Sequence, residues 1–206
     1  MRPSVSLHES DVSRETQDRF LTYLSLLETW NRKINLISPT TIRDAWTRHF
    51  IDSVQILDSY QPRSGIWGDL GSGGGFPGLI VAILCAERFP ETKAVLIESD
   101  LRKCTFLRTV IRETGIDAKV LSDRIETAPP LDAQSISARA LAPLPVLLGY
   151  VNRHLAPGGT AMLPKGENWQ AEIAEAGESW NFKFTAHKSK TNPQAVVLEI
   201  GELTHV

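Results

Sequence analysis

Cysteine is scarce in this chain, which has 206 residues and only two cysteines. The two cysteines and five histidines show neither CxxC nor HxxxH spacing, so the sequence predicts no metal site. Cys85 lies in an apolar run, whereas Cys104 lies in a separate predicted helix. This placement favours buried free thiols in a reducing cytoplasm over a disulfide framework.

Long hydrophobic runs are also missing. The longest run, LIVAILCA at residues 79–86, is too short to cross a bilayer, and the amino terminus has no apolar segment of the signal-peptide kind. We therefore expect a cytoplasmic protein with no membrane partner. The formal net charge is -2, so any nucleic-acid partner would have to bind a local basic face.

The length and the 42% hydrophobic content predict one domain over residues 1–206, with a helical extension at 1–62 and a core at 63–206. Apolar residues at helical spacing predict a first helix over 15–34, with Ser13 as its cap. A second helical stretch covers 42–57.

After these helices, predicted strands and helices alternate along the chain. Strands are expected at 66–70, 94–98, 119–121, 135–138 and 160–163, with helices beginning at 77, 101 and 144 and a short one around 169–173. Such alternation predicts an α/β fold with a mostly parallel sheet and helices on both faces. The segments NFKFT and AVVLEI, separated by a polar loop, predict an antiparallel hairpin at the carboxyl end.

A glycine-rich loop, DLGSGGGFPG at residues 69–78, lies between the first predicted strand and the next helix. Ordering so many glycines costs backbone entropy, which indicates a ligand that the main chain approaches closely. Gly73, Gly75 and Gly78 fit the GxGxxG pattern of dinucleotide-binding folds. Asp69, Gly71, Gly73 and Gly75 also fit DxGxGxG, the first motif of class I methyltransferases that use S-adenosylmethionine.

Two acidic residues help to choose between these ligands. A carboxylate at Asp69 would repel a pyrophosphate but attract the ammonium and sulfonium charges of S-adenosylmethionine. Glu98 follows the next strand, about 20 residues beyond the loop, where an acid can accept both hydroxyls of a ribose. Both cofactors contain a ribose, so Glu98 does not discriminate, and Asp100 is the better candidate for a plain helix cap.

The chain resembles a known family, the bacterial 16S ribosomal RNA (guanine-N7) methyltransferases of the RsmG (GidB) type. The resemblance covers most of the sequence and rests on the order and spacing of WNRKINLIS (30–38), RHFIDS (48–53), DLGSGGGFPG (69–78), ESDLRKCTFL (98–107), DRIE (123–126), ARALAPL (138–144) and LPKG (163–166). It implies a class I, Rossmann-like methyltransferase that transfers methyl from S-adenosylmethionine to N7 of a guanine in small-subunit ribosomal RNA. It also implies that Gly71 and Phe76 line the cofactor, that Ile125 and Glu126 flank its adenine, and that Arg139 lies in the active site.

The residue types agree with this chemistry. The segment after the fourth strand offers Arg139 but no [DNS]PP[YF] motif, which argues against exocyclic-amine methylation. Both cysteines lie in predicted helices, so no cysteine nucleophile for C5-pyrimidine methylation is expected. Ring N7 of guanine carries a free lone pair and loses no proton, so it needs no general base. Arg139 is the candidate target-side contact, and its alternative role is to tie its loop to a carboxylate.

Candidate RNA contacts are Arg48, His49, Lys165, Lys188 and Lys190. Arg48 and His49 match the RHxxDS motif of the family, and a structural role bonding Asp52 and nearby backbone also fits them. The lysines also fit a solvated role, since scattered basic residues usually serve solubility.

Three functions remain open on the sequence. The first is methylation of 16S ribosomal RNA or the 30S subunit by a monomer. The second is a class I methyltransferase that acts on a small molecule or a protein, and the third is a non-catalytic NAD-binding module.

Overall fold

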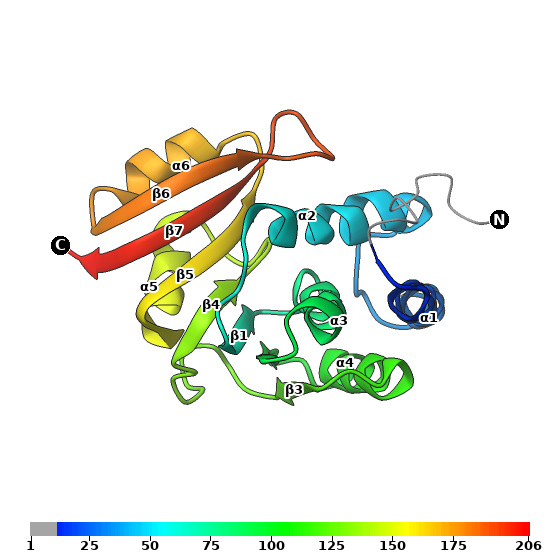
Figure 1. The fold of residues 1–206 in the computed structure, drawn as a ribbon. Coiled ribbons are helices and arrows are strands. Elements are labelled where there is room, and N and C mark those ends of the chain that lie inside the picture. Colours follow the sequence, from blue (N-terminus) through cyan, green and yellow to red (C-terminus); the bar gives the residue numbers. More distant parts are fainter. Residues whose placement is uncertain (1–11) are drawn as a thin grey trace.

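The computed structural model describes residues 12–206, and in that part of the chain it has a seven-stranded sheet with the order β3-β2-β1-β4-β5-β7-β6 (Figure 1). The strands are β1 (Gly65–Leu70), β2 (Thr92–Ile97), β3 (Ala118–Leu121), β4 (Ala133–Ser137), β5 (Leu155–Lys165), β6 (Trp180–Lys188) and β7 (Val196–His205). The α-helices are α1 (Arg14–Trp30), α2 (Asp52–Ser59), α3 (Gly78–Arg88), α4 (Leu101–Thr114), α5 (Leu144–His154) and α6 (Trp169–Ala176). Strands β1 to β5 pair in parallel, and β7 joins β5 and β6 in antiparallel fashion.

Alternating strand residues divide the interior into two cores. Trp67 and Leu96 face the core that contains α1 to α4, whereas Leu70 and Ile97 face the core that contains α5 and α6. Successive side chains of a strand point to opposite faces, so the apolar runs of β1 and β2 supply both cores. The predicted α/β fold with helices on both faces and a carboxyl-terminal hairpin is confirmed. Strand β5 is longer than the expected 160–163.

The first helix begins as predicted but ends earlier. The Ser13 side chain accepts a hydrogen bond from the Thr16 N–H and caps α1. The helix ends at Trp30 and not at residue 34, because the Asn31 side chain accepts bonds from the N–H groups of Leu36 and Ile37 and turns the chain.

The expected second helix is interrupted. A short 3-10 turn (Ile42–Asp44) leads into a π-helix (Trp46–Ile51), and only then does α2 begin. A π-helix has a wider turn than an α-helix and often marks a functional site. In this chain it carries Arg48 and His49, so it determines where these two side chains point.

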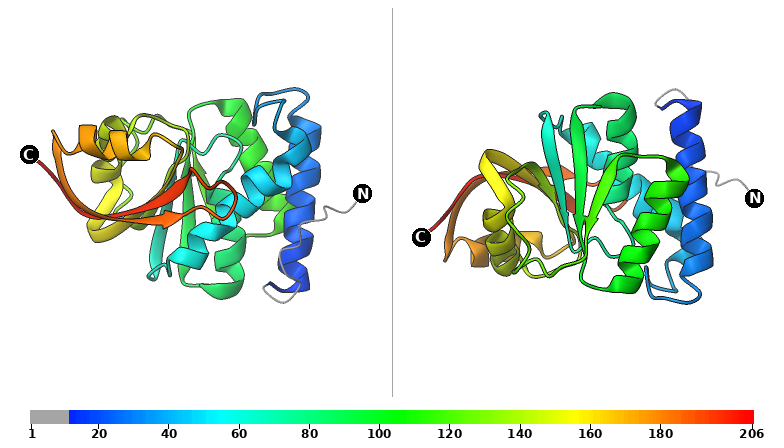
Figure 2. Two further views of the ribbon diagram at one scale, coloured as in Figure 1. Left: turned by 90° about the horizontal axis from the view of Figure 1, so that it is seen from above. Right: turned by 90° about the horizontal axis from the view of Figure 1, so that it is seen from below.

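Helix α1 lies at one end of the molecule and the β6–β7 hairpin at the other, with α2 crossing between them (Figure 2).

An aromatic cluster joins α1 and the π-helix to the glycine loop. Tyr23 stacks on Phe76 at 5.2 Å between ring centroids, and Phe50 lies 4.9 Å from Tyr23. The Tyr23 hydroxyl donates a hydrogen bond to the Gly74 carbonyl. The helical extension therefore supports the loop directly.

The Tyr23 hydroxyl should stabilise the whole molecule. Tyr23→Phe leaves the Gly74 carbonyl without its donor in a buried position, so we expect the free energy of unfolding to fall by about 1–3 kcal/mol in urea denaturation. Tyr60→Phe is the matched control, because Tyr60 pairs with the Ser135 hydroxyl, so its removal leaves no main-chain carbonyl without a donor. Equal losses in the two variants would contradict this account of the loop.

Candidate active site

A cavity of about 590 Å³ lies at the carboxyl ends of the parallel strands, where strand order reverses at β1. Open parallel sheets bind ligands at such switch points. Most residues that the sequence predicted for the cofactor line this cavity: Gly71, Gly73, Phe76, Glu98, Ile125, Glu126 and Arg139. Segments following β1, β2, β3 and β4 thus meet around one space.

Glycine occupies positions 73 and 75 of the loop for different physical reasons. Gly73 has a φ of +54°, and a Cβ there would meet only a backbone oxygen at 3.8 Å, so this position is open towards the cavity. Gly75 has a φ of +93°, but a Cβ there would lie 2.5 Å from Leu79 and 2.6 Å from Tyr23. Packing within the protein is thus a sufficient reason for Gly75, which does not line the cavity, whereas Gly71 and Gly73 do; cofactor binding by these three glycines stays a prediction.

Glu98 fixes the loop from the neighbouring strand. One carboxylate oxygen accepts a hydrogen bond from the Gly73 N–H at 2.8 Å, and the other accepts from the Asp100 N–H at 2.8 Å. Glu98 also lines the cavity, so ribose binding by this residue stays a prediction. Asp100 caps α4 through bonds from the N–H groups of Arg102 and Lys103, which confirms its plain role.

Asp69 lies beneath the loop and outside the cavity lining. Its side chain is buried, and one oxygen accepts a hydrogen bond from the Ser137 hydroxyl at 2.6 Å. Burial raises the pKa of Asp69 to about 6, against the lowering effects of the Ser137 and Ser72 hydroxyls and of Arg139. Because Asp69 does not line the cavity, its predicted attraction for a cationic ligand would act across the loop, and this role stays a prediction.

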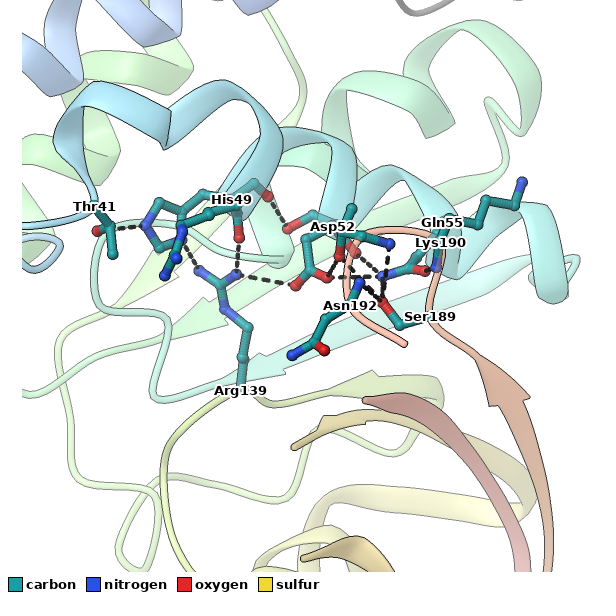
Figure 3. A network of polar contacts seen from close by, with 11 residues as sticks. Thr41, His49, Asp52, Gln55, Arg139, Ser189, Lys190 and Asn192 are labelled. Carbon is teal, nitrogen blue, oxygen red and sulfur yellow. Dashed lines mark hydrogen bonds and ion pairs between the residues drawn. The ribbon is translucent and has the colours of Figure 1, made fainter. Parts of the chain in front are cut away.

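Arg139 is the centre of a polar network (Figure 3). Its guanidinium donates to the His49 Nδ1 at 2.9 Å, lies 3.4 Å from an Asp52 oxygen and sits 5.2 Å from the centroid of the Phe76 ring. Burial lowers the pKa of Arg139, while Asp52 raises it. The carboxylate, the imidazole and the aromatic face together compensate a buried cation.

His49 is neutral near pH 7. Burial first, then the charges of Arg139 and Arg48, lower the pKa of His49 to about 4. Its Nδ1 accepts from Arg139, so the proton lies on Nε2, which is 3.0 Å from the Thr41 hydroxyl. Both ring nitrogens are occupied, so His49 has no free position to act as a base.

A second cavity, of about 670 Å³, lies on the other side of Arg139 and shares His49, Arg139 and Ala140 with the first. Sequence reasoning missed it. Its walls come from the π-helix and α2, the end of β5, α6 and the loop between β6 and β7. Asp52 joins two of these walls, because it accepts a hydrogen bond from the Thr191 hydroxyl at 2.6 Å as well as contacting Arg139. In the sequence, the one signal for this second cavity is that Asp52 belongs to the RHFIDS motif.

The candidate RNA contacts separate into two groups. Arg48, His49 and Lys165 line the second cavity. Lys188 is exposed on β6, Lys190 pairs with Asp58 at 2.7 Å, and neither lines the first or the second cavity. Among the described residues, Asp52 contacts Arg139, Gln55 and Thr191. The alternative role of Arg48 and His49, bonding Asp52 and nearby backbone, therefore finds no support at Asp52 itself.

Within residues 12–206, no group of three or more potential metal-ligating side chains comes together. In the same part of the chain, no helix combines the length and apolar character that crossing a membrane requires. Cys85 and Cys104 are free and buried, as expected.

Comparison with known proteins identifies relatives over nearly the full length. A family model described as "GidB: rRNA small subunit methyltransferase G" matches residues 16–197. A Ruegeria protein named "Ribosomal RNA small subunit methyltransferase G" is 53% identical over 198 residues, which are 96% of this chain and 96% of that protein. A Cereibacter sphaeroides protein of the same name is 48% identical over 206 residues and covers 100% of both chains.

Solved structures show the same fold at lower identity. A crystal structure described as a SAM dependent methyltransferase from Aquifex aeolicus has a TM-score of 0.58 and 13% identity, and it covers 86% of this chain and 97% of that one. This likeness concerns the fold alone and confirms the predicted class I, Rossmann-like sheet.

The raised pKa of Asp69 gives stability a defined pH dependence. The pKa is 3.8 for an ordinary aspartate and about 6 in the folded protein, so only the folded state keeps this proton between about pH 4 and pH 6. The Asp69 contribution to the free energy of unfolding therefore falls as pH rises through this window. We therefore expect the free energy of unfolding of Asp69→Asn, minus that of the native chain, to be more positive at pH 7 than at pH 4.5. Urea denaturation at the two pH values measures this difference. A difference between the two proteins that stays constant with pH would contradict the buried-carboxyl assignment.

Proposed function

Because the chain belongs to the family of rRNA small subunit methyltransferase G, we propose that it transfers a methyl group from S-adenosylmethionine to N7 of a guanine in small-subunit (16S) ribosomal RNA. One observation carries this proposal beyond family membership. Two cavities meet at the wall formed by His49, Arg139 and Ala140, so a methyl donor in one and an acceptor base in the other can approach each other.

The first cavity fits S-adenosylmethionine, which supplies an electrophilic methyl on a sulfonium when bound. The Gly73 main chain and the Glu98 carboxylate would hold its amino-acid and ribose portions, and Ile125 and Glu126 would flank the adenine. Buried Asp69 lies on this side and favours a cationic ligand over a pyrophosphate. The donor set therefore supports the sulfonium compound over the dinucleotide.

Methylation at N7 requires placement more than proton transfer. The guanine N7 lone pair lies in the ring plane, and no proton leaves on attack. This matches a shared wall whose histidine has both nitrogens engaged, and both cysteines are buried away from it. Orientation of two bound reactants can contribute roughly 7–11 kcal/mol in favourable cases.

Arg139 would hold the acceptor side. Its side chain reaches both cavities, and Asp52, His49 and Phe76 fix its position. A guanidinium can donate to a phosphate or to guanine O6 in fixed geometry. The cations Arg48, Lys188 and Lys190 would contact more distant phosphates, which gives the local basic face that the net charge of -2 requires.

The direct test is transfer of tritiated methyl from S-adenosylmethionine to 30S subunits and to naked 16S ribosomal RNA, followed by nuclease mapping. We expect one labelled nucleotide, recovered as 7-methylguanosine. Label in a metabolite extract or in ribosomal protein, with none in RNA, would favour the small-molecule or protein alternative. Calorimetry with S-adenosylhomocysteine and NADH separates both from an NAD-binding module.

Arg139→Ala should abolish methyl transfer to RNA while S-adenosylhomocysteine affinity, measured by calorimetry, stays within a few fold. The physical reason is that the guanidinium is proposed to place the acceptor, whereas main-chain groups and Glu98 hold the cofactor. Arg112→Ala, in an exposed ion pair on α4, is the control and should keep full activity. A large loss of cofactor affinity in Arg139→Ala would place this side chain on the cofactor side instead.

A further inference from the structure

A partly buried ion pair, Lys165 with Glu172, forms part of the second cavity, and nothing above gives Glu172 a role in the reaction. The Lys165 Nζ lies 2.7 Å from a Glu172 oxygen, and the Lys165 side chain is only 9% exposed. Lys165 ends β5 and Glu172 lies on α6, so two elements bring this pair to the cavity. An ammonium and a carboxylate side by side present a donor next to an acceptor.

The pair is tied to the wall between the two cavities. The Lys165 Nζ also donates to the Ala142 carbonyl at 3.3 Å. Ala142 lines the first cavity and belongs to the segment that carries Arg139. A base bound against Lys165 would therefore lie close to the edge where the methyl group is delivered.

Glu172 has an unused acceptor. Its Oε2 accepts from the Lys165 Nζ and from the Leu144 N–H at 2.9 Å, while its Oε1 has no partner among the described residues. Asp52, the other carboxylate of this cavity, has a partner on each oxygen, because Gln55 and Thr191 donate to one and Arg139 lies 3.4 Å from the other. Glu172 is thus the carboxylate with capacity for a ligand N–H.

We propose that Glu172 and Lys165 together determine the choice of guanine, an inference that rests on the proposed function. The Watson–Crick edge of guanine places the O6 acceptor beside the N1–H donor, whereas adenine places a donor beside an acceptor in the reverse order. Lys165 donates to O6 and the Glu172 Oε1 accepts from N1–H. Ring N7 lies on the imidazole side of the base, so this contact leaves N7 free to face the methyl donor.

Adenine presents its donor and acceptor in the reverse order, so the Lys165–Glu172 pair would reject adenine as well as recognise guanine. Adenine would place its amino group against the Lys165 ammonium and its N1 lone pair against the Glu172 carboxylate. Both contacts are repulsive, and a site built for one hydrogen-bond pattern rejects the analogue that lacks it. A purely structural ion pair, holding α6 to β5, would not affect this choice between bases.

The test uses 30S subunits with guanine at the mapped target and subunits with adenine at the same position. Wild-type protein should methylate the guanine subunits at least about 100-fold faster, as kcat/KM. In Glu172→Gln the amide oxygen can still accept from the Leu144 N–H, while the amide NH2 can donate a hydrogen bond to adenine N1. We expect this variant to lower the guanine rate about 10-fold or more and the guanine-to-adenine ratio by at least about 10-fold.

Glu175→Gln, an exposed carboxylate on the same helix, is the matched control and should change neither rate. Guanine and adenine differ in intrinsic reactivity, but this difference does not depend on the protein variant. A change in the guanine-to-adenine ratio between variants therefore reports recognition by the protein. Rates for guanine and adenine that fall together in Glu172→Gln would overturn the inference in favour of a structural pair. Wild-type activity that is equal on the two subunits would overturn it without any variant, whereas no wild-type labelling of 30S subunits would instead reject the proposed function.

Discussion

The largely buried positive charge of Arg139 is the constraint on which the site depends. A guanidinium mostly removed from water must be compensated, and here the compensation comes from two segments distant in sequence from it. One carries His49 in the π-helix and Asp52 at the start of α2, and the other carries Phe76 in the glycine loop. Each of these contacts fixes one wall of a cavity. The helical extension, the loop after β1 and the loop after β4 therefore meet at this side chain, while Tyr23 and Glu98 hold the loop after β1 independently of it.

Asp52 extends this constraint to the carboxyl-terminal hairpin. It accepts a hydrogen bond from Thr191, while Gln55, one turn along α2, bonds the Ser189 hydroxyl and the Lys190 N–H (Figure 3). These bonds fix the loop between β6 and β7 against α2. The two segments are far apart in the sequence, since Gln55 and Lys190 are separated by 135 positions. The second cavity exists because this loop forms one of its sides.

Local chemistry explains what the sequence could predict. The Ser13 cap and the positive φ of Gly115, which ends α4, follow from short-range rules, and the strand–loop–helix around residues 69–78 follows from apolar runs on either side of the glycines. The first cavity was predictable because all its segments follow parallel strands, whose carboxyl ends meet at one edge. The second was not, because Glu172 and Thr191 reach it through pairings that no local pattern encodes. The π-helix was missed because one added residue in a turn leaves hydrophobic spacing almost unchanged.

The proposed reaction moves a positive charge and does not create or remove one, and the distribution of acids matches that movement. Before transfer the charge would lie on the sulfonium of a donor bound on the side of Asp69, and after transfer it would lie on a guanine ring bound on the side of Asp52 and Glu172. Only a field that favours the displaced charge more than the initial one lowers the barrier. Asp52 and Glu172 each already pair with a cation, Arg139 and Lys165, so neither supplies a full negative charge to that field. What Glu172 keeps is an oxygen without a partner among the described residues. A hydrogen bond to this oxygen from the N1–H of the base strengthens as the ring gains positive charge, so the contact inferred to recognise guanine also stabilises the product cation.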